Sequence, residues 1–356
     1  MSTTTKCNLI NSSRWRLVAV SLSFIGWLAS CSILGGEASP EPLFSVPQGF
    51  PEPSYDLSKN PLTNDGVALG KKLFYDGILS RDGSISCGEC HNQSHAFTHH
   101  GHGFSHGIDD QEGTRNAQPL VNLAWQDSFF WDGGVFDLDL FSIAPIENPL
   151  EMDEKIGNVL QKLRTHKDYP RLFKKAYGTD EITTERFLKA LSQFLLTLVS
   201  ANSKYDQYLA GKAQLAPDEA AGLQLFKEKG CATCHSGMLF TDHSFRSNGL
   251  LPEYTDDLGR YRITENPQDK NKFKVPTLRN IEVTYPYMHD GRFLNLEGVL
   301  EHYAGGVKQT DNLDPLLKQN GRLGIAMTKE EQQKIIAFLK TLTDKDFLTN
   351  PRFAAP

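Results

Sequence analysis

The chain has 356 residues and a formal net charge of −6, from 43 acidic and 37 basic side chains. This length allows two ordinary domains, and the excess of acid argues against a nucleic acid as a partner, because nucleic-acid-binding proteins present basic surfaces. A hydrophobic fraction of 39% and a charged fraction of 22% are typical of a globular protein rather than a disordered one.

The first thirty residues have the pattern of an export signal. Arg14 and Arg16 precede an apolar run over 17–29, and small residues follow the run. This order predicts a signal peptide over 1–30, since the run is short for a transmembrane helix. Residues 28–31, Leu-Ala-Ser-Cys, resemble the lipobox of bacterial lipoproteins, so we expect Cys31 to carry a lipid that anchors the protein to a membrane. A plain secretory peptide with a chance cysteine is the alternative.

The elements that follow are mainly helical. Residues 31–60 are rich in Pro, Ser and Gly and predict a tether or wrapping arm. Helices are expected over 68–74, 154–164, 187–199, 221–226 and 329–342. Thr183 or Thr184 can cap the third of them, and Thr328 the last. Strand signals are few, so we predict a mainly α fold.

Two segments repeat a common pattern, Gly-X-X-Leu-Phe on a short helix followed by Cys-X-X-Cys-His. The pentapeptides lie at 87–91 and 231–235, and the helices at 68–74 and 221–226 precede them. Repetition of a whole unit predicts two related, cytochrome c-like haem domains. We place the N-terminal domain over 61–205 and the C-terminal domain over 206–356.

Cys-X-X-Cys-His is the attachment signature of c-type haem. The two thiols add to the two vinyl groups of one porphyrin, and the His supplies the proximal nitrogen to the iron. A zinc ribbon would need its Cys pairs about 15–20 residues apart, and a thioredoxin-type pair would lie in a βαβ pattern. We therefore expect two covalent haems, attached at Cys87, Cys90, Cys231 and Cys234, with His91 and His235 as axial ligands. Because bacteria attach c-type haem in the periplasm, we expect the protein there.

Six further stretches surround the two motifs: Ala-Phe-Thr at 96–98, and 113–116, 130–133, 145–152, 273–280 and 285–291. Over about 62–342 they make the chain resemble the di-haem cytochrome c peroxidase/MauG family. The resemblance implies an oxidoreductase that reduces hydrogen peroxide at the N-terminal haem. Electrons would come through the C-terminal haem from a small redox protein or a quinol-linked donor. Family members often pair, so a homodimer is a further expectation.

Three other functions stay open at this point. A MauG-like oxidase would use high-valent haem to oxidise a protein or a small molecule. A non-catalytic di-haem electron carrier would have two six-coordinate irons and bind no substrate, and a haem-based sensor would bind a ligand without turnover.

The resemblance also assigns single residues. Glu151, six residues after Pro145, matches the distal acid that takes a proton from peroxide and returns it to the leaving oxygen; an exposed acid before a helix is the alternative. Trp131 matches the Trp between the haems, and a plain core aromatic is its alternative. A calcium site at the domain junction is implied by matches at Asn122, Thr284 and Pro286.

Tyr303 matches the sixth ligand of the C-terminal haem, where the peroxidases have Met and MauG-like proteins have Tyr. An anionic oxygen ligand favours ferric iron, whereas a thioether raises the potential. A merely buried Tyr303, or Met288 as the ligand, are the alternatives. Two departures stand out: Phe141 replaces a common Gln, and Lys229 replaces the Trp through which the maturase oxidises its protein substrate.

One loop is unusually rich in His. Its five members are His95, His99, His100, His102 and His106. In the family a loop His can close the resting N-terminal haem, and His106 is nearest to that region. The other interpretations are a solvated loop and non-specific metal binding.

Overall fold

The computed structural model describes residues 42–251, 256–319 and 321–356. The expected signal peptide, Cys31 and the first part of the arm lie outside the described residues. Among the described residues, no helix is long and apolar enough to cross a membrane.

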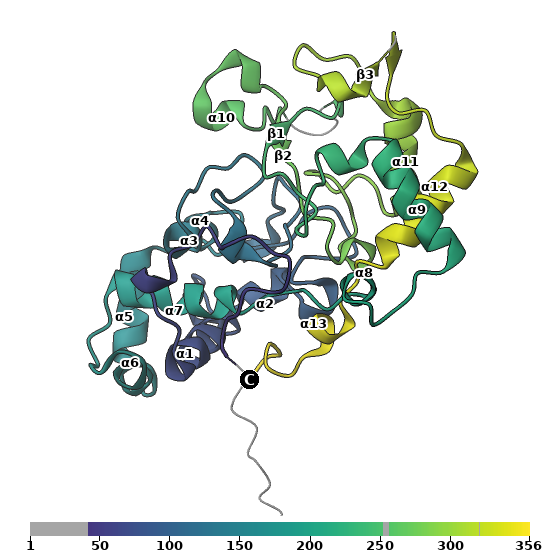
Figure 1. Ribbon diagram of the computed structural model, residues 1–356. Helices are drawn as coiled ribbons and strands as arrows, with labels where there is room; N and C mark the ends of the chain where they lie inside the picture. Colours follow the sequence, from purple (N-terminus) through teal and green to yellow (C-terminus); the bar gives the residue numbers. More distant parts are fainter. Residues whose placement is uncertain (1–41, 252–255, 320) are drawn as a thin grey trace, which may run out of the picture. The chain divides into compact units, whose positions relative to one another are not determined.

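Helices dominate the described chain, as expected (Figure 1). In chain order they are α1 (Asn64–Phe74), α2 (Cys87–Cys90), α3 (Leu138–Phe141), α4 (Ile143–Glu147), α5 (Ile156–Thr165), α6 (Tyr169–Tyr177), α7 (Thr184–Leu196), α8 (Lys204–Leu209), α9 (Pro217–Glu228), α10 (Tyr261–Thr264), α11 (Leu296–Glu301), α12 (Lys329–Lys340) and α13 (Lys345–Thr349). Two short antiparallel pairs join β1 (Phe245–Arg246) to β2 (Phe273–Lys274) and β3 (Lys318–Gln319) to β4 (Arg322–Leu323).

The capping residues set the helix starts that the sequence predicts. The Thr183 side chain accepts a hydrogen bond from the backbone of Arg186 at the start of α7, and Thr328 and Glu331 form a capping box at the start of α12. The helix expected over 154–164 begins two residues later, at Ile156, and the one expected to reach 199 ends at Leu196. Boundary shifts of this size are usual for helix ends.

Two large hydrophobic clusters and a small third one, of Val307, Leu313 and Leu317, form the core of the described residues. The first surrounds α1 and α7 and includes Leu73, Phe187 and Phe194, and the second is built around α9 and α12. The end of the chain returns to the first cluster, since Phe347 and Phe353 are buried there. The expected boundary at 205/206, and the relation of two haem domains by a repeat, stay predictions.

The Gly of each Gly-X-X-Leu-Phe segment lies where two helices meet closely. A Cβ on Gly70 of α1 would come within 1.9 Å of the Ala190 carbonyl oxygen on α7. A Cβ on Gly222 of α9 would come equally close, 1.9 Å, to the Lys334 carbonyl oxygen on α12, which lies alongside α9 (Figure 1). Only Gly allows this backbone approach, so the segment serves the same packing purpose at both places.

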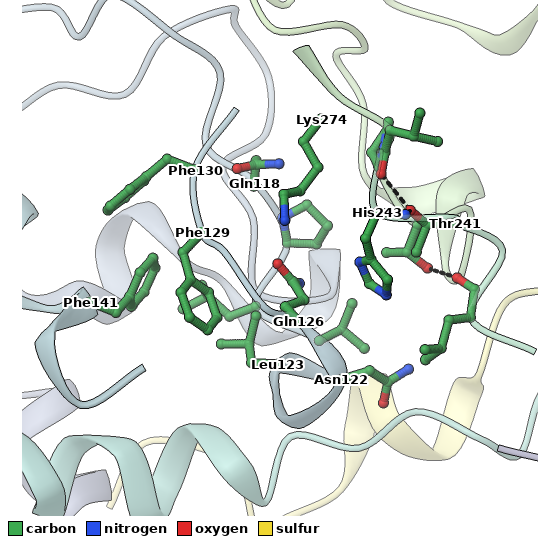
Figure 2. Close-up of a pocket in the computed structure, with 17 residues that line it drawn as sticks. Gln118, Asn122, Leu123, Gln126, Phe129, Phe130, Phe141, Thr241, His243 and Lys274 are labelled. Atoms are coloured by element: carbon green, nitrogen blue, oxygen red, sulfur yellow. Dashed lines mark hydrogen bonds between the residues drawn. The ribbon is translucent and has the colours of Figure 1, made fainter. Parts of the chain in front are cut away.

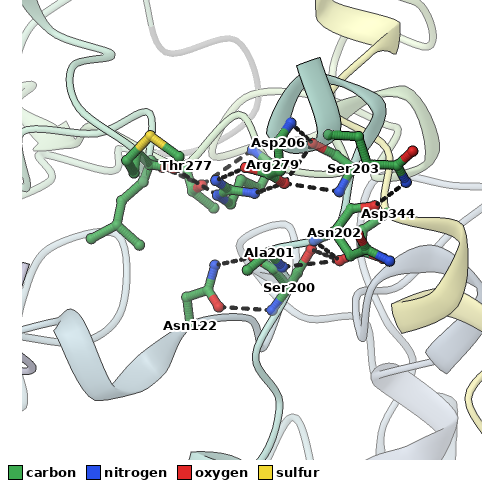
Figure 3. Close-up of polar contacts among 12 residues, drawn as sticks. Asn122, Ser200, Ala201, Asn202, Ser203, Asp206, Thr277, Arg279 and Asp344 are labelled. Atoms are coloured by element: carbon green, nitrogen blue, oxygen red, sulfur yellow. Dashed lines mark hydrogen bonds and ion pairs between the residues drawn. The ribbon is translucent and has the colours of Figure 1, made fainter. Parts of the chain in front are cut away.

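The segment between α7 and α8 is fixed by buried polar contacts (Figure 3). Asp344, 2% exposed, accepts hydrogen bonds from the backbone of Ala201 and Asn202, both at 2.9 Å. Arg279 donates to both carboxylate oxygens of Asp206 at 2.8 and 2.9 Å. Buried carboxylates require hydrogen-bond partners of this kind. The contacts therefore hold the segment and the first turn of α8 against residues far along the chain.

Candidate active site

The first pentapeptide forms the short helix α2, which presents two thiols and a His. The backbone N–H of His91 donates to the Cys87 carbonyl at 2.8 Å, which closes the turn. Nδ1 of His91 donates to the Phe97 carbonyl at 2.7 Å, so Nε2 is left for a metal. Burial lowers the pKa of His91 to about 4, which keeps the ring neutral and able to ligate. None of the four motif cysteines is in a disulfide.

The second pentapeptide repeats this arrangement. The backbone of His235 donates to the Cys231 carbonyl at 3.0 Å, and its Nδ1 lies 3.1 Å from the Pro276 carbonyl and 3.2 Å from that of Phe240. Burial lowers the pKa of His235 as well. In both motifs one ring nitrogen is held by backbone carbonyls, which orients the other as a ligand.

A large cavity opens beside the second motif. Its volume is about 230 Å³, and Cys231, Cys234 and His235 lie in its wall. Two sulfur atoms and an imidazole on one side, with mostly apolar side chains around them, are the groups that a covalently attached haem requires.

Trp131, Tyr303 and Met288 line the same cavity. The Trp131 indole donates to the Asn116 carbonyl at 2.8 Å and is 9% exposed. Its ring lies 6.5 Å from the ring of His289. Burial raises the pKa of Tyr303 to about 12. The structure therefore gathers both candidate sixth ligands at one cavity with the second motif.

Glu151 lies in the turn between α4 and α5, and its charge acts on both cysteines of the first motif. Asn148 Nδ2 donates to its Oε1 at 2.6 Å, and its backbone carbonyl accepts from Ile108 at 2.8 Å. Burial raises the pKa of Glu151, and the Asn148 bond opposes this in part. Burial, with a smaller contribution from the Glu151 charge, raises the pKa of Cys90 to about 11. The half-buried carboxylate is thus near the first haem-attachment thiols.

The three expected calcium ligands border different cavities. Thr284 and Pro286 line the large cavity, whereas Asn122 borders a smaller hollow (Figure 2). The Asn122 amide donates to the Ser200 carbonyl at 3.1 Å and accepts from the Ser200 N–H at 2.9 Å. One lone pair of its oxygen is thus engaged by the protein.

Aromatic and basic side chains surround the smaller hollow. Figure 2 shows Phe129, Phe130 and Phe141 on one side and Thr241 and His243 on the other. Phe141, which replaces the common Gln, stacks on Phe130 at a ring distance of 4.9 Å. Nε2 of His243 is buried with no hydrogen-bond partner among the described residues.

The His-rich loop pairs its own rings. His95 stacks on His100 at 3.7 Å, and Nε2 of His99 lies 3.1 Å from Nε2 of His102. His106 Nδ1 is 2.6 Å from an Asp110 carboxylate oxygen. Within the described residues, no group of three or more His, Cys, Asp or Glu side chains has the arrangement of a metal site.

Sequence reasoning missed several residues of these sites. Asn148 holds Glu151, and Asn248 donates to the Met288 sulfur at 3.5 Å. Arg115 joins two acids from separate segments, Asp132 and Asp257, both at 2.6 Å. Arg115 and Asn148 lie within the family-like stretches 113–116 and 145–152, and this position in the sequence could have identified them. Asn248 lies outside all six, so the sequence had no signal for it.

Comparisons with known proteins agree with this arrangement. The profile of the family described as di-haem cytochrome c peroxidase matches residues 64–214. A cytochrome c551 peroxidase of Nitrosomonas europaea is 36% identical over 337 residues, which cover 92% of each chain. A methylamine utilization protein MauG of Methylorubrum extorquens is 37% identical over 310 residues, which cover 84% of this chain and 83% of that protein.

Among solved structures, a MauG-like protein associated with microbial copper homeostasis is similar with a TM-score of 0.80. It is 31% identical, and the match covers 88% of this chain and 99% of that one. The expected family and the interpretation as a peroxidase-type enzyme are thereby confirmed. The chain belongs to the di-haem cytochrome c peroxidase family and is an oxidoreductase with two haem c groups.

Proposed function

We propose that peroxide reacts at the haem carried by Cys87, Cys90 and His91, and that electrons reach it through the haem carried by the second motif. The bound iron supplies the site at which the oxygen–oxygen bond is split. The observation that carries the proposal is the unequal surroundings of the two motifs. The charge of a half-buried carboxylate, Glu151, acts on both cysteines of the first motif, and a phenol, Tyr303, lines the cavity of the second.

Glu151 acts as the general base and acid of this reaction. Burial raises the pKa of its carboxyl group, which brings the group closer to the range in which it both accepts and returns a proton. The Asn148 amide holds Oε1 at 2.6 Å, so the second oxygen is left to take a proton from peroxide and to deliver it to the departing oxygen.

Tyr303 and Trp131 serve the second haem. Tyr303 and His235, which line the same cavity, would both ligate the second iron, and an anionic oxygen ligand would favour its oxidised state. Trp131 is held by its bond to Asn116 at 2.8 Å and couples the two irons electronically.

A MauG-like oxidase is the second candidate function. The Tyr at position 303 favours it, as does the 37% identity to a MauG protein. Lys229 argues against the same protein target, because its ammonium group pairs with Glu331 at 2.7 Å, and an ammonium group cannot pass an oxidising equivalent as an indole can.

Location, partners and a second metal complete the proposal. We place the protein in the periplasm, tethered through a lipid on Cys31, with a small redox protein or a quinol-linked enzyme as electron donor and a second copy as a dimer partner. A Ca²⁺ ion held by Asn122, Thr284 and Pro286 fits the preference of this ion for oxygen ligands. Treatment with a chelator, followed by metal analysis and peroxide turnover, tests the calcium site.

Stopped-flow mixing of the di-haem protein with hydrogen peroxide tests the main proposal. Glu151→Gln should slow the reaction by about 10²–10⁴. The matched control is Glu147→Gln. Glu147 lies at the end of α4 and accepts from the Ile156 N–H at 3.2 Å, which Gln also does. Its ion pair with exposed Lys155, at 3.6 Å, would be lost, but such a surface pair contributes little. The control should stay within a few-fold of the parent. A Glu151→Gln rate equally close to the parent would exclude the acid–base role.

A further inference from the structure

Two chemically different ligands border the cavity of the second motif and share one polar neighbour. Met288 and Tyr303 both line that cavity, and so does Asn248. Asn248 Nδ2 donates to the Met288 sulfur at 3.5 Å. The same side chain also acts on the Tyr303 hydroxyl, since burial raises the pKa of Tyr303 and Asn248 opposes this rise. A thioether is a weak acceptor, so this bond holds the sulfur lightly.

Asn248 is itself fixed from two sides. Its Oδ1 accepts from the Leu250 N–H at 3.2 Å, which leaves the NH₂ group of the amide directed toward Met288. Its backbone carbonyl lies 3.1 Å from Nε2 of His302, the residue before Tyr303. The chain itself therefore sets the orientation of this amide.

The backbone at both ligands is unusual. Met288 has a φ of 76°, a left-handed conformation that is uncommon for a side chain other than Gly, Asn or Asp. Tyr303 lies in a π-helical turn over His302–Gly306. Strained residues and π-turns concentrate at functional sites, and here each of them brings a different ligand atom to one cavity.

We propose that Asn248 is a positioning residue that holds Met288 back as a reserve sixth ligand while Tyr303 serves the ferric state. The inference rests on the proposed function, in which Tyr303 faces the second haem. When the donor protein delivers one electron, the hard phenolate loses affinity for the ferrous iron and the soft thioether gains it. Tyr303 then takes one proton from water and leaves as a phenol, and Met288 takes its place. Re-oxidation returns one electron to an acceptor and one proton to water.

The test is a spectroelectrochemical titration of the di-haem protein. Met288→Leu should remove the ferrous ligand and shift the reduction equilibrium of the second haem toward ferric at least tenfold, about 59 mV. Asn248→Ser keeps an acceptor for the Leu250 N–H but lacks the amide donor. The Asn248→Ser variant should let Met288 bind ferric iron too. This should produce a thioether-to-iron(III) charge-transfer band and shift the reduction equilibrium of the second haem toward ferrous at least tenfold. Asn248→Ala should behave like Asn248→Ser.

Combined variants and a separate control make the result decisive. Adding Met288→Leu to Asn248→Ser should abolish the new band. An unchanged potential in Met288→Leu, or an unchanged spectrum in both Asn248 variants, overturns the inference. The variant Tyr303→Phe distinguishes failure of the reserve-ligand inference from failure of the proposed function. If Tyr303→Phe changes the ferric spectrum but the Met288 and Asn248 variants change neither spectrum nor potential, only the reserve ligand is rejected. If Tyr303→Phe leaves the ferric spectrum unchanged, Tyr303 is rejected as the ligand.

Discussion

Replacing Arg279 by Met should lower the free energy of unfolding by about 3–5 kcal/mol, the usual cost of leaving one member of a buried ion pair alone. The Arg279 side chain is 0% exposed, and that of Asp206 is 10% exposed. Two hydrogen bonds to Asp206, at 2.8 and 2.9 Å, and one to the Met238 carbonyl, at 2.7 Å, would be lost. Asp206 keeps its bonds to Ser203 at 2.7 and 2.8 Å, so we expect the lower half of the range.

The loss should depend on pH. Burial alone would raise the pKa of Asp206, but the hydrogen bonds and charge of Arg279 outweigh it and hold the pKa below its usual value. In the parent the ion pair therefore stabilises above the ordinary Asp pKa of about 3.9, and this contribution is lost as the pH falls. In Arg279→Met the buried carboxylate has no cation, so its pKa rises and protonation relieves the penalty. The difference between the two proteins should shrink on acidification.

Urea unfolding of the haem-loaded protein, followed by far-ultraviolet circular dichroism, measures both effects. An exposed pair is the control: Lys329 and Glu301 are 72% and 55% exposed, so Lys329→Met should cost less than about 1 kcal/mol. The double variant Arg279→Met, Asp206→Leu should recover much of the loss, since no charge stays buried. A loss below about 1 kcal/mol in Arg279→Met, or one that is constant with pH, would refute the reasoning from burial.

Three further outcomes are expected. Burial raises the pKa of Glu151 above its ordinary value. The rate of peroxide reaction should therefore rise with pH through an apparent pKa above that ordinary value. Stopped-flow kinetics should show this rise in the parent and a flat pH profile in Glu151→Gln. Gly222→Ala should cost about 1–3 kcal/mol in urea unfolding, because its Cβ would meet the Lys334 carbonyl, while Gly157→Ala, with open space around it, should cost nothing. Tyr303→Met should raise the potential of the second haem; a potentiometric titration without a shift would show that Tyr303 is not its ligand.

Local sequence patterns predicted those parts of the fold whose causes are local. The starts of α7 and α12 depend on capping residues within one turn, so Thr183 and Thr328 identified them. The Cys-X-X-Cys-His motifs are equally local, because the first Cys carbonyl and the His N–H close one turn, as at Cys231 and His235. The end of α7 was overestimated because Leu198 continues the apolar pattern but is buried beyond the helix.

Contacts between distant segments could not be predicted in this way. Asn248 meets the Met288 sulfur across 40 residues and His302 across 54. Neither Asn248 nor its sequence neighbours carry a recognisable pattern, because the contacts of this amide depend on the tertiary structure alone. The return of Phe353 to the first core cluster is of the same kind, since an isolated apolar residue near a chain end does not say which core it joins.

The difference between the two haem sites must arise on their distal sides. On the proximal side both sites are alike: a one-turn Cys-X-X-Cys segment, and a His whose Nδ1 is held by a backbone carbonyl, that of Phe97 at 2.7 Å or of Pro276 at 3.1 Å. Hydrogen bonds of the same kind, to one carbonyl at His91 and to two at His235, raise the basicity of both imidazoles as ligands, so they do not by themselves explain a reactive iron and an electron-transferring one. The proposed distal groups, Glu151 near one motif and Tyr303 near the other, come from segments outside the repeated pattern. A repeated attachment unit with unrepeated distal segments is therefore sufficient to produce two haems with different chemistry.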